Sequence, residues 1–241
     1  MEKIEKFQLI LSCAIITLGI LLSSLVFSSK MQKNENITVT GSASKIVQSD
    51  SGALRFDIQT RAVNQKAAFN VIKNQTPVVV KYLTSKGIEQ KDITIRAISG
   101  YYIYKMNANG YNTNEVAAYS ASSAFEVKSK DVQKIKEIST DIQNLVDKGI
   151  DLSIQTPEYY YSDLASIKIE LLKEATKDAR QRAISMLSAT GSHVGKVKSM
   201  RMGVFQITAP DSTSVSDMGI NDTTTIDKKV TAVANVVFKV K

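Results

Sequence analysis

The stretch DLASIKIELLKEATKDARQRAISMLSATG, residues 163–191, predicts the longest helix of the chain downstream of its N-terminal region. Its apolar and small residues recur every three or four positions, which places them on one face of an α-helix. These residues are Leu164, Ile167, Leu171, Ala175, Ala179, Ala183 and Leu187. Gly191 is the expected residue after the helix, because glycine readily adopts the left-handed conformation found there. The alanines predict close packing of this helix, either within the domain or at a seam between subunits.

Strand-like segments lie on both sides of this helix. Residues 37–41 alternate β-branched residues, and residues 54–61 alternate apolar with charged or polar side chains, as a half-buried strand does. Residues 197–205 predict a further strand. Residues 230–240 predict the last strand, whose inward-facing residues are Val230, Ala232, Ala234, Val236, Phe238 and Val240.

The middle of the chain predicts two more helices and a hairpin. Asn64 is the expected N-cap of the first helix, which ends at Gly87 and which Pro77 should bend or split. The hairpin has a strand to about Lys105, a loop over 107–114 containing Asn109-Gly110, and a return strand over 119–127. The remaining elements are a helix from Asp131 to Gly149, a strand over 150–154 and a flexible loop over 208–228.

The predicted order of elements is therefore ββαββ followed by αβαββ. Helices and strands are interspersed without the strict alternation of a parallel α/β fold, so we expect an α+β domain over residues 37–241. Its helices should pack on a mainly antiparallel sheet.

The N-terminal region predicts a membrane segment. Residues 7–27 contain no charged residue, and at ~1.5 Å of rise per residue such a helix crosses a hydrocarbon core of ~30 Å. We expect a short tail over 1–6, a transmembrane helix or uncleaved signal anchor over 7–27, and a linker over 28–36. The alternative is a cleaved signal peptide and a secreted domain. A short N-terminus before a large domain favours an extracytoplasmic location, although the flanking lysines are balanced.

Composition favours anionic partners. The 241-residue chain has a formal net charge of +8, and the charges of the N-terminal tail cancel. A basic surface suits lipid headgroups, anionic envelope polymers or acidic proteins. No block of Lys and Arg with interleaved aromatic residues is present, so nucleic acid is not expected as a partner. The single cysteine, Cys13, lies within the apolar segment, so the domain has no internal disulfide.

Residues that would carry catalysis or bind a metal do not converge in the sequence. His193 is the only histidine and sits in a glycine-flanked loop, and zinc requires several Cys or His ligands. Glu170, Glu174 and Asp178 are spaced along the long helix among basic residues, which is typical of a solvated, salt-bridged face. We therefore expect no catalytic residue, no metal and no cofactor.

Tyrosines provide the clearest functional hint. Adjacent residues of a strand point to opposite faces, so neighbouring tyrosines cannot all enter one core. Exposed tyrosines are enriched at interfaces. The candidate interface residues are Tyr101, Tyr102, Tyr104, Tyr111, Tyr159, Tyr160 and Tyr161.

Several motifs resemble the SIMPL domain family. Residues 37–41 resemble its opening I-x-V-x-G strand, and Tyr119–Val127 followed by Asp131 resembles its Y-x-A strand. The Asp-Ala helix and its following glycines are the best match, whereas Ser49-Asp50-Ser51 departs from the usual Pro-Asp turn. The packing motif that the resemblance implies comprises Gly41, Ala175, Asp178, Ala179, Ala183, Gly191 and Gly195.

The resemblance implies an exported envelope protein. Bacterial members are usually periplasmic, some resemble ring-forming oligomers, and a role in oxidative stress has been proposed for the family. We therefore expect a homo-oligomer, or a binder of an envelope component, that acts without catalysis. The alternatives are a carrier of a small apolar ligand with residues 208–228 as a lid, and an unrecognised enzyme.

Overall fold

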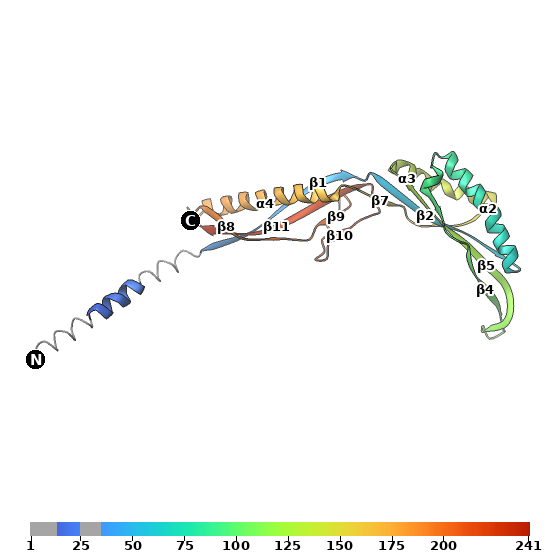
Figure 1. The fold of residues 1–241 in the computed structure, drawn as a ribbon, viewed down its shortest axis with the longest axis horizontal. Helices are drawn as coiled ribbons and strands as arrows, with labels where there is room; N and C mark the ends of the chain where they lie inside the picture. The colour runs from blue at the N-terminus through green and yellow to red at the C-terminus, as the bar shows by residue number, and fades with distance from the viewer. Residues whose placement is uncertain (1–13, 25–34) are drawn as a thin grey trace, which may run out of the picture. The chain divides into compact units, whose positions relative to one another are not determined.

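The computed structural model describes residues 14–24 and 35–241, which form a mixed α+β structure with two sheets (Figure 1). The described part contains four α-helices: residues 14–24, α2 (Gln65–Ser85), α3 (Val132–Asp141) and α4 (Leu164–Ser188). The longer strands are β1 (Asn36–Gln48), β2 (Ser51–Ala62), β4 (Ser99–Met106), β5 (Asn112–Ser129), β8 (Val194–Met202) and β11 (Asp227–Val240). The shorter strands are β3 (Ile93–Ile95), β6 (Asp151–Ile154), β7 (Glu158–Tyr160), β9 (Gln206–Thr208) and β10 (Ile220–Asn221). The α+β class is confirmed.

Only part of the predicted membrane segment falls within the described residues. Residues 14–24 are helical, with exposed side chains. The tail 1–6, Cys13, both ends of the segment 7–27 and residues 28–34 of the linker lie outside the described residues. Among the residues that the structure describes, no helix has both the length and the hydropathy needed to span a membrane.

The chain divides into two compact units. Unit 1 contains the described residues before Lys45 together with Lys168–Phe205 and Thr231–Lys241. Unit 2 contains Lys45–Ile167 and Gln206–Val230.

Unit 2 is built on a six-stranded sheet in the order β3-β5-β2-β6, with β4 also paired to β5 and β7 also paired to β2. The alternation of β2 buries Leu54, Phe56 and Ile58 against α2 and α3, while Arg55 and Asp57 lie on the other face. The rings of Phe56 and Phe125 stack with centroids 5.1 Å apart. Helices therefore cover one face of this sheet, as expected for an apolar stripe on each strand (Figure 1).

The ends of α2 follow the sequence prediction. The Asn64 side chain accepts a hydrogen bond from the backbone N–H of Ala67 at 2.9 Å, so Asn64 is the N-cap. Gly87 has a φ of 80°, and Ile88 donates to the carbonyl of Leu83 at 3.1 Å, as in a Schellman motif. The helix runs through Pro77 without being split. Ile72 and Val79, on either side of this proline, are both fully buried and hold the two halves on the sheet.

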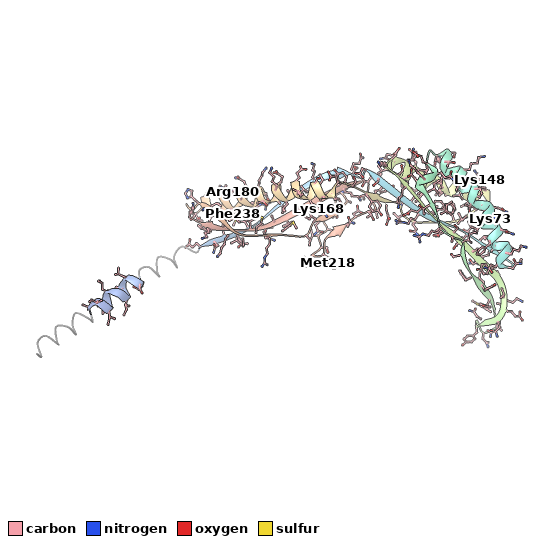
Figure 2. All side chains as sticks on the ribbon, viewed as in Figure 1. Lys73, Lys148, Lys168, Arg180, Met218 and Phe238 are labelled. Carbon is pink, nitrogen blue, oxygen red and sulfur yellow. The ribbon has the colours of Figure 1, made fainter. Side chains whose placement is uncertain are left out.

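The second sheet has five strands in the order β1-β11-β9-β10, with β8 also paired to β11, and unit 1 packs α4 on its β1, β11 and β8 part. The buried face of β11 carries Val230, Ala232, Ala234, Val236 and Phe238, as predicted, whereas Val240 is only half-buried. Figure 2 labels Phe238 on β11 and the exposed Arg180 on α4. Gly191 has a φ of 73° and follows α4, which confirms its predicted place at the end of the helix.

Several element boundaries differ from the sequence predictions. β5 begins at Asn112, so three residues of the predicted loop 107–114 are in a strand. β7 was not predicted, and β8 ends three residues before the predicted end at 205. The segment predicted as a loop over 208–228 includes the end of β9, all of β10 and the first two residues of β11. The domain boundaries and the flexibility of residues 208–228 stay predictions.

The end of this segment is fastened by a buried lysine. Lys228 is 3% exposed, and its ammonium group donates to the backbone carbonyls of Asp222 at 2.6 Å and Thr225 at 2.8 Å. The Asp222 carboxylate accepts from the backbone N–H of Thr224 at 2.9 Å. Bonds within the turn 222–228 thus hold it in place, together with the bond from the N–H of Tyr159 to the carbonyl of Thr223.

Candidate functional site

The β4–β5 hairpin extends beyond the rest of its sheet. β5 pairs with β2 only as far as Tyr119, which lies opposite Ala62. The pairing of β4 with β5 continues past this point to Met106 opposite Asn112. Beyond Tyr119 the sheet therefore consists of two strands only. We call this projecting part, together with Tyr102 at its base, the ribbon (residues 102–118; Figure 1).

Four of the predicted interface tyrosines lie on or beside the ribbon and are exposed. Tyr101 is 64% exposed, Tyr102 48%, Tyr104 42% and Tyr111 71%. Met106 and Val116 add exposed apolar surface to the same hairpin. A two-stranded hairpin is only marginally stable in water. The exposed aromatic side chains on this hairpin are therefore not explained by packing within its own sheet.

One ring fastens the base of the ribbon. The Tyr102 ring meets the ring of buried Tyr119 edge-on, with centroids 4.9 Å apart. Tyr119 in turn contacts Phe69 of α2, with centroids 6.2 Å apart. Tyr102 therefore orients the ribbon, whereas Tyr101, Tyr104 and Tyr111 have no ring contact among those of the described residues.

The other three candidate tyrosines lie elsewhere. β7 pairs with the beginning of β2, where Tyr160 is opposite Ser51, so these tyrosines are at the opposite end of the sheet from the ribbon. Tyr159 is 5% exposed and belongs to the core, which excludes its ring from surface contacts. Tyr161 is half-buried and Tyr160 is exposed. The sequence was right that the run 159–161 is divided between core and surface, but these residues do not join the hairpin tyrosines.

The uncovered face of the sheet carries an ion-pair network around Arg55. Its Nη2 lies 2.9 Å from Glu126 Oε1, and its Nη1 bonds to Glu158. The Tyr160 hydroxyl also donates to Glu158, at 2.6 Å. The bond from Arg55 lowers the pKa of Glu126, and the bond from Tyr160 is the main cause that lowers the pKa of Glu158. These groups stabilise the ends of β2, β5 and β7 and remain charged.

A groove of about 610 Å³ lies at the same end of unit 2 as β7. Its lining includes four lysines: Lys91, Lys128, Lys130 and Lys134. Three of them have partners: Lys91 pairs with Glu89 at 2.7 Å, Lys128 with Glu126 at 3.3 Å, and Lys134 donates to the carbonyl of Gly87 at 3.3 Å. Its lining contains no methionine and one tyrosine, Tyr160, so it is not the Tyr- and Met-lined groove that a carrier of apolar ligands would need.

The residues of the predicted packing motif come together in unit 1. A Cβ atom on Gly41 would lie 2.1 Å from the carbonyl oxygen of Ala175 and 2.3 Å from the nitrogen of Ala179. β1 therefore touches the backbone of α4, and the fully buried Ala183 continues this contact surface along α4. Gly195 allows a similar approach, because a Cβ there would lie 2.7 Å from the carbonyl oxygen of Lys239. The motif is thus an intramolecular packing device.

Asp178 of the same motif binds the backbone of β1. Its carboxylate accepts from the N–H of Ser42 at 2.8 Å and from Nε of Arg182 at 2.8 Å. The backbone bond is the main cause that lowers the pKa of Asp178. This residue therefore fixes the position of β1 beside α4.

We expect acid to destabilise the protein through these carboxylates. Because the folded-state pKa values of Asp178, Glu126 and Glu158 lie below their ordinary values, their stabilisation is present above the unfolded pKa. It is lost as the pH falls through the folded pKa, that is, below about pH 4. The free energy of unfolding, measured by urea titration between pH 3 and 7, should fall in this window. In Asp178→Asn, whose amide oxygen still accepts from Ser42, the fall should be smaller. An equal fall in both proteins would contradict this assignment.

The remaining candidate groups show structural contacts. His193 is exposed, and its backbone pairs with that of Lys241 in both directions at 2.8 and 2.9 Å. Glu174 forms an ion pair with Lys177 at 2.7 Å on the exposed side of α4. Among residues 14–24 and 35–241, no three His, Cys, Asp or Glu side chains are grouped so as to hold a metal.

Comparison with known proteins identifies the family. A search of curated proteins finds no match to this chain. The model of the SIMPL family, described as a protein of unknown function (DUF541), matches residues 37–238. The match spans both compact units, β1 through β11, and so includes the Gly41–α4 contact and the tyrosine hairpin. The chain therefore belongs to the SIMPL family.

Proposed function

We propose that this protein is a membrane-tethered, extracytoplasmic contact protein that works without catalysis. It binds a second copy of itself or another envelope component through the ribbon and its tyrosines. The observation that carries the proposal is the two-stranded projection, with Tyr104 and Tyr111 exposed on it and Tyr101 exposed beside its base.

The energetics of the ribbon support this role. An isolated two-stranded hairpin is marginally stable, and exposed tyrosine offers large contact area at low entropic cost. Docking of the ribbon onto a partner would bury the rings and add contacts that its own sheet does not supply. Tyrosines are also among the residues that dominate binding energy at interfaces.

The ionisation of the acidic groups supports a non-catalytic role. A general acid at neutral pH needs a raised pKa, whereas the carboxyl groups of Asp50, Glu126, Glu158, Asp178 and Asp222 all have lowered pKa values. Each of these carboxylates accepts hydrogen bonds or ion pairs that hold a turn or strand in place.

The membrane location rests on the uncharged residues 7–27 and on the resemblance to exported members of the family. A periplasm-dependent reporter fused after Lys241 should be active, and a cytoplasm-dependent reporter at the same place should be inactive. The opposite pattern of reporter activity would contradict the proposed extracytoplasmic location. Sequencing of the mature N-terminus would distinguish the anchor from the cleaved alternative.

The ribbon tyrosines should control association. We expect Tyr101→Ala together with Tyr111→Ala to weaken association at least tenfold, since each ring exceeds 60% exposure and its loss leaves the core intact. Sedimentation of the purified full chain in detergent, alone and with envelope extract, measures the effect. Tyr160→Ala is the matched control, because it removes the same ring at the other end of the sheet. Equal association of the wild-type protein, the Tyr101→Ala, Tyr111→Ala protein and the Tyr160→Ala protein would count against the ribbon as the contact surface.

A further inference from the structure

β1 forms an open edge of the sheet in unit 1. It is the terminal strand in the order β1-β11-β9-β10, so its only strand neighbour among the described residues is β11. The N–H of Val240 donates to the carbonyl of Glu35 at 2.9 Å, and the Thr40 hydroxyl donates to Asn235 Oδ1 at 2.6 Å. Both pairs have the same sum of residue numbers, which defines an antiparallel register between β1 and β11.

The backbone groups of alternate β1 residues point away from β11. In an antiparallel pair, residues whose N–H and C=O bind the partner strand alternate with residues whose groups face the other way. Glu35 faces β11, so the even-numbered Thr38, Thr40 and Ser42 face the open edge. The bond from the N–H of Ser42 to Asp178 agrees with this assignment, since Asp178 lies on α4 and not on a strand.

The edge is accessible at Thr38 and Thr40. A groove of about 480 Å³ runs beside it, lined by Thr38, Val39 and Thr40 of β1 and by Gln181, Arg182, Ser185 and Met186 of α4. Arg182 in this groove is balanced by Asp178. The accessible edge ends at Ser42, where Asp178 already occupies the N–H.

The charges on the two edge strands of unit 1 indicate which strand can pair with the open edge of β1. Natural edge strands are usually protected by charges, and β8, the other edge strand of unit 1, carries Lys196, Lys198 and Arg201. Residues 36–44 of β1 carry no charge. Like charges opposite each other destabilise a strand pair, so two copies of β8 would repel, whereas two copies of β1 would not.

We propose that β1 pairs antiparallel with β1 of a second copy of this chain about a twofold axis at Val39. Thr38 then lies opposite Thr40 of the partner subunit, and the two residues exchange both backbone hydrogen bonds. The pairing joins the five-stranded sheets of the two copies into one and places the grooves of both copies along the seam. Such an interface uses the same surface on each copy, as twofold dimers do. It uses a surface different from the ribbon and does not depend on the function of the ribbon.

Cysteine cross-linking of the full chain tests the register. In a Cys13→Ser background, which contains no other cysteine, Thr38→Cys and Thr40→Cys are introduced together. Directly opposed, hydrogen-bonded residues have Cα atoms about 5.5 Å apart, within the range of a disulfide. We expect mild oxidation of the purified protein in detergent to give a covalent dimer on a non-reducing gel. Thr38→Cys alone should stay monomeric, because residue 38 is diagonal to its own copy at roughly 7–8 Å.

A second measurement covers the case in which a cysteine pair is poorly oxidised. Thr38→Pro removes the N–H that faces the open edge, while Thr38→Ala keeps it. We expect sedimentation to show at least tenfold weaker dimerisation for Thr38→Pro only, with unchanged circular dichroism for both proteins. The Tyr101→Ala, Tyr111→Ala protein should form the β1 dimer normally, which separates this inference from the role of the ribbon. Equal dimerisation of the Pro and Ala proteins, or cross-linking of Thr38→Cys to Ser199→Cys on β8 in place of the 38–40 link, would overturn the proposal.

Discussion

Replacing Gly41 with alanine is expected to unfold unit 1 at room temperature. The added Cβ would lie 2.1 Å from the carbonyl oxygen of Ala175 and 2.7 Å from Cα of Ala179. Both are backbone positions, so no side chain can rotate away, and either β1 or α4 must move. Overpacking usually costs about 1–3 kcal/mol. A clash with fixed backbone belongs among the exceptional cases of about 4 kcal/mol or more.

Gly203→Ala is the matched control for this change. It adds the same methyl group in the same unit, but the new Cβ would lie 3.3 Å from Cβ of Val233 and 3.4 Å from its carbonyl oxygen, contacts that a shift of a few tenths of an ångström relieves. We expect a loss of about 1 kcal/mol or less. Urea unfolding followed by circular dichroism compares the two proteins. Equal midpoints would mean that β1 does not touch the backbone of α4.

Lys228→Met is expected to have the second-largest effect on stability. It removes the ammonium group but keeps most of the side-chain volume, so the carbonyls of Asp222 and Thr225 lose their buried partner. Removing one partner of a buried, hydrogen-bonded charge costs about 3–5 kcal/mol. Burial lowers the pKa of Lys228, whereas the Asp222 carboxylate, 4.0 Å away, favours the charged form. The change should therefore lower the free energy of unfolding by several kcal/mol at neutral pH.

Lys229→Met provides the comparison within the same strand. Lys229 is half-buried and donates to one carbonyl, that of Ser212 at 2.7 Å. We expect its replacement to cost about 1 kcal/mol. Limited proteolysis of residues 208–228 adds a local readout, since loss of Lys228 should expose this segment to cleavage. A Lys228→Met protein as stable and as resistant as Lys229→Met would show that the buried lysine does not fasten the turn.

Much of the fold was predictable because periodicity reports burial directly. The stripe of α4 and the alternation of β2 and β11 correspond to the buried faces of these elements. The helix ends at Asn64, Gly87 and Gly191 were predictable for a local reason, since capping bonds and left-handed glycines depend on adjacent residues.

The length of the ribbon was not predicted, because residues 112–116 carry no apolar alternation that would indicate a half-buried strand. The available signal was the Asn109-Gly110 turn. A turn at this place requires the return strand to be about as long as β4, and therefore to begin near Asn112. The exposed tyrosines were predicted because adjacent residues of a strand point to opposite faces. The same alternation gave no signal for where β5 begins.

The role of Lys228 could not be inferred from the sequence either. Residues 208–228 are polar and rich in Ser, Thr and Asp, which is the composition of a loop. Whether such a segment orders itself depends on distant contacts, such as the bond from the N–H of Tyr159 to the carbonyl of Thr223 at 2.7 Å. Tyr159 was assigned to the surface for a related reason. It is buried by the pairing of β7 with β2, where it lies opposite Gly52, and these two strands are far apart in the sequence.

Hydrogen exchange of the ribbon amides tests most directly whether it is a contact surface. The full chain would be compared at low concentration, at high concentration and with envelope extract. If the ribbon docks on a partner, the amides of residues 102–118 should exchange rapidly in the dilute protein and become protected under one of the other conditions. The amides of β2 should be protected throughout. A ribbon whose exchange is the same in all three samples would contradict the proposed function.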